Sequence, residues 1–180
     1  MNSAAILNGG RASRFGGQDK SALLVDGRTI RERQIAELSR VTTDIVIVTT
    51  DIVPGCGPLG GLHTALTDAR GDAVFVVACD MPFIDASFVE YLLDLTREAD
   101  LVVPRTERGY HPLCAAYTRA CLSAVARRLA DRQLQMTGLM ADVETRVVTS
   151  EEIDRFGDRN RLLANVNTQA EYAGIQTHKL

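Results

Sequence analysis

Hydrophobic residues along the chain fall into short continuous runs, separated by longer segments in which apolar positions recur every three or four residues. The continuous runs predict buried strands at 3–7, 44–49 and 73–79, with shorter strands at 100–104, 112–117 and 145–149. The recurring positions predict amphipathic helices at 28–40, 59–69, 86–98 and 119–130. Strands that are hydrophobic throughout are covered on both faces. The alternation therefore predicts an α/β fold with a mainly parallel sheet between helical layers.

The length of 180 residues fits one ordinary domain, and no repeat, low-complexity tract or linker interrupts the pattern. We therefore expect a single domain over residues 1–180. The longest apolar run, 73–79, is too short to cross a bilayer, and the N-terminus lacks the features of a signal peptide. The four cysteines form no CxxC pair, which favours reduced thiols in a cytoplasmic protein.

The net charge of −3 gives no overall positive field that would attract nucleic acid or an anionic membrane. Twenty Lys and Arg residues still leave cations for a local anion site. The three histidines are scattered along the chain, which argues against a zinc site. Any charged chemistry is therefore expected in a local cluster of side chains.

Ligands of parallel α/β sheets bind outside the carboxyl ends of the strands, and unusual residues follow the first strand here. The segment 8–20 reads NGGRASRFGGQDK. Its four glycines let the backbone approach a ligand, and successive amides form an anion nest. Arg11, Arg14 and Lys20 add cations suited to a polyphosphate. It is not a Walker A loop, because no Gly-Lys-Ser/Thr follows the glycines. The alternative is a surface loop with solvated charges.

The segment PGCGPLGG follows the second strand and contains the pattern G-x-G-x-x-G, with Asp80 lying 20 residues beyond the last glycine of that pattern. A dinucleotide-binding fingerprint is therefore one interpretation. Against it, the four residues 51–54 lie between the strand and the first glycine, and Pro58 removes one N–H from the motif while suiting a helix start. We favour a rigid turn that lets a ligand approach the backbone.

The segment Cys79-Asp80-Met81-Pro82-Phe83 ends the most apolar strand. A carboxylate at this point is placed to act as an oxygen ligand for Mg²⁺. Pro82 biases Met81 toward an extended conformation, which keeps Asp80 apart from the next helix. The alternative is a helix-capping role for Asp80, for which Asp85 is the better candidate.

Two further segments are candidates for the site. His111 lies in the sequence RGYHPL, although a single histidine is more often structural. Asn165 and Asn167 alternate on one face of a predicted short strand at 165–168. Thr168 is a candidate N-cap for the last helix, so a structural role for Asn167 is the alternative.

Taken in order, the motifs NGGRASRFGGQDK, GPLGG, CDMPF, HPL and NVNT resemble those of the molybdenum cofactor guanylyltransferase family over nearly the whole chain. The resemblance implies a three-layer, Rossmann-like nucleotide-diphospho-sugar-transferase fold with a mostly parallel central sheet and helices on both faces. It also implies transfer of GMP from GTP to molybdopterin or Mo-molybdopterin, with release of pyrophosphate and formation of the guanine dinucleotide cofactor. Molybdenum-insertion and molybdoenzyme maturation proteins are the partners implied.

For the nucleotide, the resemblance implies contacts from the residues that end and follow the first strand and from one aspartate. These are Leu7, Asn8, Gly9, Gly10 and Asp51. The family usually has Ala where Asn8 stands. The paired glycines that follow look more like the guanylyl than the cytidylyl branch.

For the phosphates, the resemblance implies binding by Lys20 with help from Arg14, and Mg²⁺ held by Asp80. Asn165 and Asn167 would lie toward the pterin. These assignments make Arg14, Lys20 and Asp80 the candidate catalytic residues.

The passage between Thr50 and Asp51 is shorter than in the family, where a further short strand and a base-binding amide intervene. Either the protein lacks that segment or residues are absent from the sequence. Base specificity is the expectation that depends most on this passage. The alternatives are a nucleotidyltransferase that uses CTP or a sugar phosphate, and a non-catalytic nucleotide-binding module.

Overall fold

A computed structural model describes residues 1–8, 14–15, 18–167 and 171–173, with the backbone alone for 14, 15, 18 and 19. The central sheet contains β1 (Asn2–Leu7), β6 (Ile45–Val48), β7 (Ala73–Ala78), β8 (Leu101–Thr106), β9 (Gly109–Tyr110), β10 (Cys114–Thr118) and β11 (Thr145–Val148). The strand order is β11-β8-β10-β7-β1-β6, with β9 beside β8. β1 is parallel to both of its neighbours, and β10 is antiparallel to both of its own. All the other strands except β9 run in the direction of β1.

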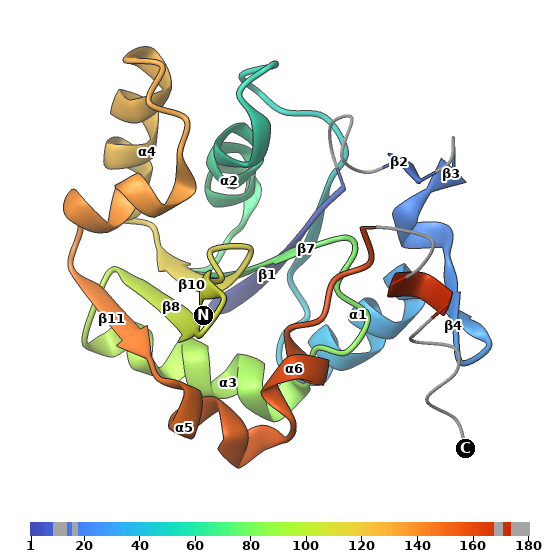
Figure 1. The fold of residues 1–180 in the computed structure, drawn as a ribbon. Helices are drawn as coiled ribbons and strands as arrows, with labels where there is room; N and C mark the ends of the chain where they lie inside the picture. Colours follow the sequence, from blue (N-terminus) through green and yellow to red (C-terminus); the bar gives the residue numbers. More distant parts are fainter. Residues whose placement is uncertain (9–13, 16–17, 168–170, 174–180) are drawn as a thin grey trace.

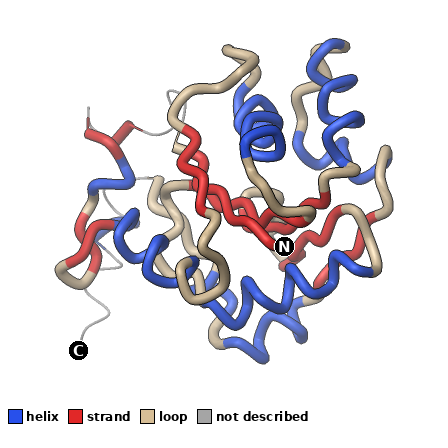
Figure 2. The backbone as a smooth tube through the Cα atoms, turned by 180° about the vertical axis from the view of Figure 1, so that it is seen from behind, coloured by secondary structure: helices blue, strands red, loops and turns tan. Residues whose placement is uncertain are grey.

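Helices cover both faces of this sheet (Figure 1). α2 (Gly57–Asp68) and α4 (Cys121–Ala130) lie on one face; α1 (Ile30–Leu38), α3 (Ala86–Asp94), α5 (Ser150–Ile153) and α6 (Arg159–Leu162) lie on the other. Figure 2 shows the same three layers from behind. Short 3₁₀ helices are η2 (Lys20–Ala22), η3 (Leu95–Arg97), η4 (Met136–Ala141) and η5 (Asp154–Phe156). The predicted α/β fold is thus confirmed.

The two hydrophobic cores explain why the central strands are apolar throughout. Ala4 and Ile6 of β1 face the core under α3, whereas Ala5 faces the core under α2. Successive side chains of a strand point to opposite faces, so a strand buried on both sides needs apolar residues at every position. The four cysteines are buried in these layers without forming a disulfide.

Two short hairpins, β2 (Arg14–Phe15) with β3 (Gln18–Asp19) and β4 (Leu24–Val25) with β5 (Arg28–Thr29), lie outside the central sheet. Neither hairpin is predicted from the hydrophobic pattern of the sequence. In the second hairpin, Asp26 and Gly27 have φ values of 54° and 78°. This Asp-Gly pair suits a two-residue hairpin turn, which needs both residues in the left-handed region.

Most predicted elements begin or end a few residues from the observed ones, and two of the differences have a clear local cause. The helix predicted from residue 28 begins at Ile30, because the Thr29 side chain accepts from the Glu32 amide and Glu32 bonds back to Thr29 in a capping box. The predicted strand at 165–168 is wrong over its described residues 165–167, which form no strand; Val166 donates to a single carbonyl, that of Asp80, at 2.8 Å. Thr168 lies outside the described residues. Within the described ranges, none of the helices has the length and apolar character needed to traverse a bilayer.

A polar cluster at the outer end of the sheet joins α5, β11 and α3. Glu152 accepts hydrogen bonds from Arg146, from the Thr149 amide and, at 2.6 Å, from the Tyr91 hydroxyl. Burial raises the pKa of Glu152, but the bonds from Arg146, Thr149 and Tyr91 outweigh it and lower this pKa to about 2. The ionised carboxylate therefore stabilises the folded state above the ordinary glutamate pKa, and this contribution disappears as the pH falls toward 2.

We expect Glu152→Gln to lower the free energy of unfolding at pH 7 by about 1–2 kcal/mol, since each bond to a charged group contributes about 1.5–3 kcal/mol and the neutral amide still accepts some of them. The difference from wild type should shrink as the pH falls from about 4.5 toward 2. Urea titrations across this range measure it. A difference that stays constant with pH would contradict the assignment.

Candidate active site

Lys20, Asp80 and Asn167 meet at the carboxyl ends of the two central strands. The Lys20 Nζ lies 3.4 Å from Asp80 Oδ2 and donates a hydrogen bond to Asn167 Oδ1 at 3.0 Å. Lys20 is only 5% exposed. The structure therefore brings together three side chains that are far apart in sequence and that the sequence analysis selected independently.

Asp80 is held where β7 and β1 end side by side. The Cys79 amide donates to the carbonyl of Leu7 at 3.1 Å, and the Val166 amide donates to the carbonyl of Asp80 at 2.8 Å. The next helix starts with Asp85, whose side chain accepts from the amides of Ser87 and Phe88. The predicted cap at Asp85 is thus confirmed, and the Asp80 carboxylate is left to face Lys20.

Lys20 opens the short helix η2 between the two hairpins. A small core of Leu23, Val25, Ile30 and Val166 packs beneath it. The Leu23 amide closes the turn on the carbonyl of Lys20 at 3.1 Å. Because Val166 belongs to both this core and the bond to Asp80, the same few residues fix the lysine, the aspartate and Asn167.

The surroundings of Asp80 would allow its carboxylate to bind a metal ion together with the phosphates of a ligand. Burial raises the pKa of Asp80 and the charge of Lys20 opposes that rise, with a net upward shift. Among the described residues, no group of three or more His, Cys, Asp or Glu side chains could hold a metal alone. Mg²⁺ commonly binds one or two carboxylates together with substrate phosphates, so one buried carboxylate fits that mode of binding.

Leu7 and Asp51 converge on the first turns of α2. A Cβ atom built on Gly61 would lie 3.2 Å from Leu7 Cδ1 and 3.6 Å from Asp51 Oδ1. One built on Gly60 would lie 3.3 Å from Asp51 Oδ2. Burial raises the pKa of Asp51. The absence of a side chain at these two glycines therefore leaves room for Leu7 and Asp51.

The first half of the PGCGPLGG turn has more open space around its glycines. Gly55 and Gly57 have φ values of 73° and 59°, in the region that favours glycine, and a Cβ on either would meet no atom within 4 Å. Pro58 stands in the first turn of α2, as a helix start allows.

The remaining predicted residues are placed only in part. The backbone amide of Asn8 donates a hydrogen bond to the carbonyl of Val48 at 2.8 Å, and Asn165 is exposed beside Val166. Gly9 and Gly10 lie outside the described residues. Arg14 lies in β2, but its side chain is outside the description, as is all of Arg11.

His111 is half-buried in the connection that leads to β10. Its Nε2 lies 2.9 Å from the Thr106 hydroxyl, and burial lowers the pKa of its imidazole. The neighbouring Leu113 carbonyl accepts from the Ala78 amide at 3.0 Å. These contacts support a structural role for the HPL segment at the end of β7.

Sequence reasoning missed Gln34, which donates hydrogen bonds to the carbonyls of Ala78 and Met81, on either side of Asp80. The spacing of apolar residues around Gln34 gave a signal in the sequence. Ile30, Gln34 and Leu38 are all fully buried and recur every four residues, so Gln34 is a polar residue in the buried stripe of α1.

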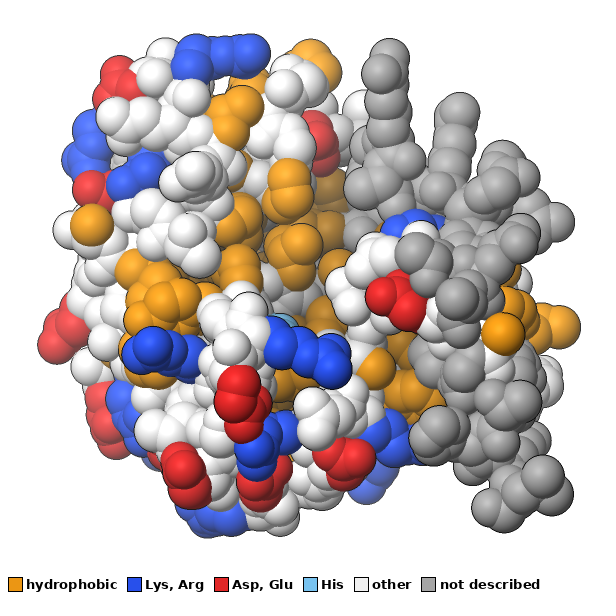
Figure 3. Space-filling model, in the orientation of Figure 1, with side chains coloured by type: hydrophobic (Ala, Val, Ile, Leu, Met, Phe, Trp, Pro, Cys, Tyr) orange, Lys and Arg blue, Asp and Glu red, His pale blue; other side chains and the backbone are white. Residues whose placement is uncertain are grey.

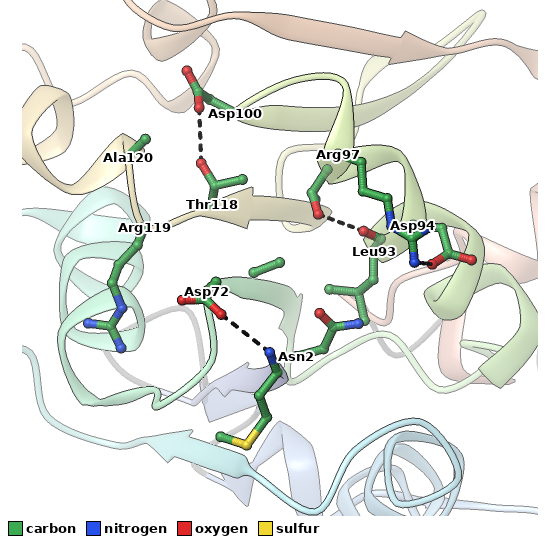
Figure 4. Close-up of a pocket in the computed structure, with 12 residues that line it drawn as sticks. Asn2, Asp72, Leu93, Asp94, Arg97, Asp100, Thr118, Arg119 and Ala120 are labelled. Carbon is green, nitrogen blue, oxygen red and sulfur yellow. Dashed lines mark hydrogen bonds and ion pairs between the residues drawn. The ribbon is translucent and has the colours of Figure 1, made fainter.

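The face of the molecule over β1 and β7 is hollowed, and hydrophobic side chains line the hollow while Lys and Arg lie at its rim (Figure 3). A separate cavity of about 500 Å³ lies at the opposite edge of the sheet (Figure 4). Charged side chains in this cavity bond to their neighbours. Arg97 lies 3.4 Å from the Asp94 carboxylate, and the Thr118 hydroxyl donates to the Asp100 carboxylate at 3.1 Å. Those pairs leave the carboxyl edge as the better candidate for chemistry.

The fold is that of an α/β nucleotidyltransferase. Molybdopterin-guanine dinucleotide biosynthesis protein A from Archaeoglobus fulgidus has a similar structure, with a TM-score of 0.84 at 20% identity over 98% of this chain and 97% of that one. A 2-C-methyl-D-erythritol 4-phosphate cytidylyltransferase from Thermus thermophilus gives a TM-score of 0.66 at 15% identity over 97% of this chain and 96% of that one. Residues 4–145 match the MobA-like NTP transferase domain, and the chain belongs to that family.

Curated relatives of similar length support this membership. A probable molybdenum cofactor guanylyltransferase from Clostridium perfringens is 32% identical over 190 residues, which cover 96% of this chain and 95% of that protein. One from Methanosarcina acetivorans is 31% identical over 193 residues, covering 92% and 86%. Both alignments are longer than this chain, so the relatives carry residues that it lacks. Membership of this family also argues against a dinucleotide-binding role for the PGCGPLGG segment.

Proposed function

We propose that the protein transfers GMP from GTP to molybdopterin or Mo-molybdopterin, releasing pyrophosphate. The observation that carries the proposal is the buried Lys20–Asp80 pair at the carboxyl ends of β1 and β7. The names of the relatives, molybdenum cofactor guanylyltransferase, support the choice of nucleotide and acceptor.

The reaction is a displacement at the α-phosphorus of GTP. A terminal phosphate oxygen of the acceptor forms the new P–O bond, and the bond from the α-phosphorus to the β-bridging oxygen breaks, so that pyrophosphate leaves with the electron pair. This nucleophile is already an anion, so the protein needs no side-chain nucleophile. The difficulty is to bring two polyanions together in line.

The residues of the cluster address that difficulty by charge and position. Lys20 would neutralise phosphate oxygens, with help from Arg14 and Arg11, and Asp80 would hold Mg²⁺. When bound, Mg²⁺ supplies further positive charge where the phosphates gather. Lys20 is nearly buried and already fixed by Asn167 at 3.0 Å, so little reorganisation is needed during the reaction.

The nucleoside would lie toward Leu7, Asn8, Gly9, Gly10 and Asp51. The carboxylate of Asp51 beside α2 suits a base that presents hydrogen-bond donors, as guanine does. Asn165 and Asn167 would lie on the acceptor side, since Asn167 contacts Lys20 from the C-terminal segment. Partnership with molybdenum-insertion and molybdoenzyme maturation proteins in the cytoplasm belongs to the same proposal.

Incubation of the purified protein with molybdopterin, Mg²⁺ and either GTP or CTP tests the function. We expect pyrophosphate release and a guanine dinucleotide product with GTP, at a rate at least about 10-fold above that with CTP, because a missing hydrogen-bond partner at a polar base site costs a kcal/mol or more. Faster turnover with CTP, or turnover only with a sugar phosphate acceptor, would favour a related transferase. Tight GTP binding without turnover would indicate a non-catalytic module.

A further inference from the structure

Gln34 is a fully buried polar residue in the middle of α1, and it bonds to the segment that carries Asp80. Its Nε2 donates to the carbonyl of Ala78 at 2.8 Å and to the carbonyl of Met81 at 3.0 Å. These two carbonyls lie immediately before and after the dipeptide Cys79-Asp80. One side-chain amide therefore bridges the turn from which the Asp80 carboxylate emerges.

The hydrogen bond that closes this turn is long. The Met81 amide lies 3.3 Å from the carbonyl of Ala78, beyond the usual N–H···O distance of about 2.7–3.2 Å. Both bonds from Gln34 fall inside that range. The orientation of the amide is also determined, since only an N–H₂ group can face two carbonyl oxygens. The Gln34 Oε1 atom has no partner among the described residues.

The same helix reaches the segment that carries Lys20. Arg31, one turn before Gln34, donates to the hydroxyl of Ser21 at 2.5 Å, next to Lys20 in the chain. Arg33 donates to the carbonyl of Pro82 at 3.1 Å. Residues three apart on a helix lie on one side of it, so α1 bonds to both segments of the cluster at once.

We propose that Gln34 is a positioning residue, which holds Asp80 at the separation from Lys20 that lets one metal–triphosphate unit contact both. This inference rests on the proposed function. A neutral amide suits the task, because it supplies two donors without adding a charge to the segment that carries Asp80. Groups that orient the ligands of a metal typically change metal affinity or activity by about 10–100-fold when they are replaced.

The test is Gln34→Met, which keeps the length and apolar volume of the side chain and removes both donors. We expect the affinity for Mn²⁺ in the presence of GTP, measured by electron paramagnetic resonance, to fall about 10–100-fold. Turnover should fall at low Mg²⁺ and recover in part at saturating Mg²⁺. Ile153→Ala is the control, since it removes buried volume from the same hydrophobic core at α5, which contacts β8 and η5 and contributes no hydrogen bond to residues 78–81 among the described residues. It should leave the metal dependence unchanged.

A second readout needs neither nucleotide nor metal. Amide hydrogen exchange in residues 78–83 should accelerate in Gln34→Met, while exchange in α4 stays at the wild-type rate. A folded Gln34→Met protein that keeps the wild-type value of either readout overturns the proposal. If that variant does not fold, Gln34→Asn, which withdraws the amide by one methylene, should show both effects, and the wild-type values there overturn the proposal equally. Wild-type protein that lacks GTP turnover contradicts the proposed function alone, because the exchange result is independent of it.

Discussion

Replacement of Asp80 by asparagine is expected to lower the turnover of GTP about 10²–10³-fold, the usual loss when one charged element of a phosphate site is removed. The amide keeps the shape of the side chain and an oxygen that can accept from Lys20, which lies 3.4 Å from the carboxylate. The fold should therefore remain intact. The variant loses the negative charge that the proposed Mg²⁺ site requires at this position, so its turnover should also respond less to added metal.

Asp72→Asn is the matched control for this experiment. Asp72 precedes the same strand, β7, that Asp80 follows, and its side chain is 91% exposed at the opposite edge of the sheet (Figure 4). The chemical change is the same, and we expect turnover within about twofold of wild type, because exposed pairs contribute little. A near-normal rate in folded Asp80→Asn would contradict the role of Asp80.

The position of this cluster could be predicted because each of its parts has a local signal. A fully apolar strand predicts a central position in the sheet, and parallel strands present the residues after them at one edge. Lys20 and Asp80 were therefore expected to meet, and they do. The signals fail where a contact depends on the tertiary arrangement alone. Residues 165–167 alternate polar and apolar side chains as a strand does. The Val166 amide nevertheless donates one hydrogen bond to the carbonyl of Asp80, and these three residues join no β-ladder.

The support of the cluster was harder to infer than the cluster itself. A glutamine within a helix is usually solvent-exposed, and only the buried neighbours four residues away on either side distinguish Gln34. Asp51 was selected by family resemblance, whereas its approach to Gly60 and Gly61 depends on how the loop before α2 folds back. The hairpin at Asp26-Gly27 had a recognisable turn signal, but flanking runs of two residues are too short to show strand periodicity.

Lys20→Met should lower turnover by a similar factor of about 10²–10³, because the methionine keeps the apolar stem and removes the charge that we propose neutralises the phosphates. It should also change how stability depends on pH. Lys20 is the main group that lowers the pKa of Asp80 against the effect of burial, so this pKa should rise further in the variant. A buried carboxylate without its partner costs roughly 3–5 kcal/mol, and protonation relieves that cost.

The sign follows from linkage. A carboxyl group whose pKa is raised in the folded state stabilises the fold fully below its ordinary pKa, and that stability is lost as the pH rises through the folded-state value. The stability of Lys20→Met relative to wild type should therefore decline as the pH rises above the raised pKa that Asp80 has in the wild-type fold, which urea unfolding at a series of pH values measures. Lys20→Arg keeps the charge and should not show this decline, even if the longer side chain slows turnover. A pH-independent difference for Lys20→Met would show that Asp80 does not depend on the lysine. The pair could then not be the unit that shares a metal and a triphosphate.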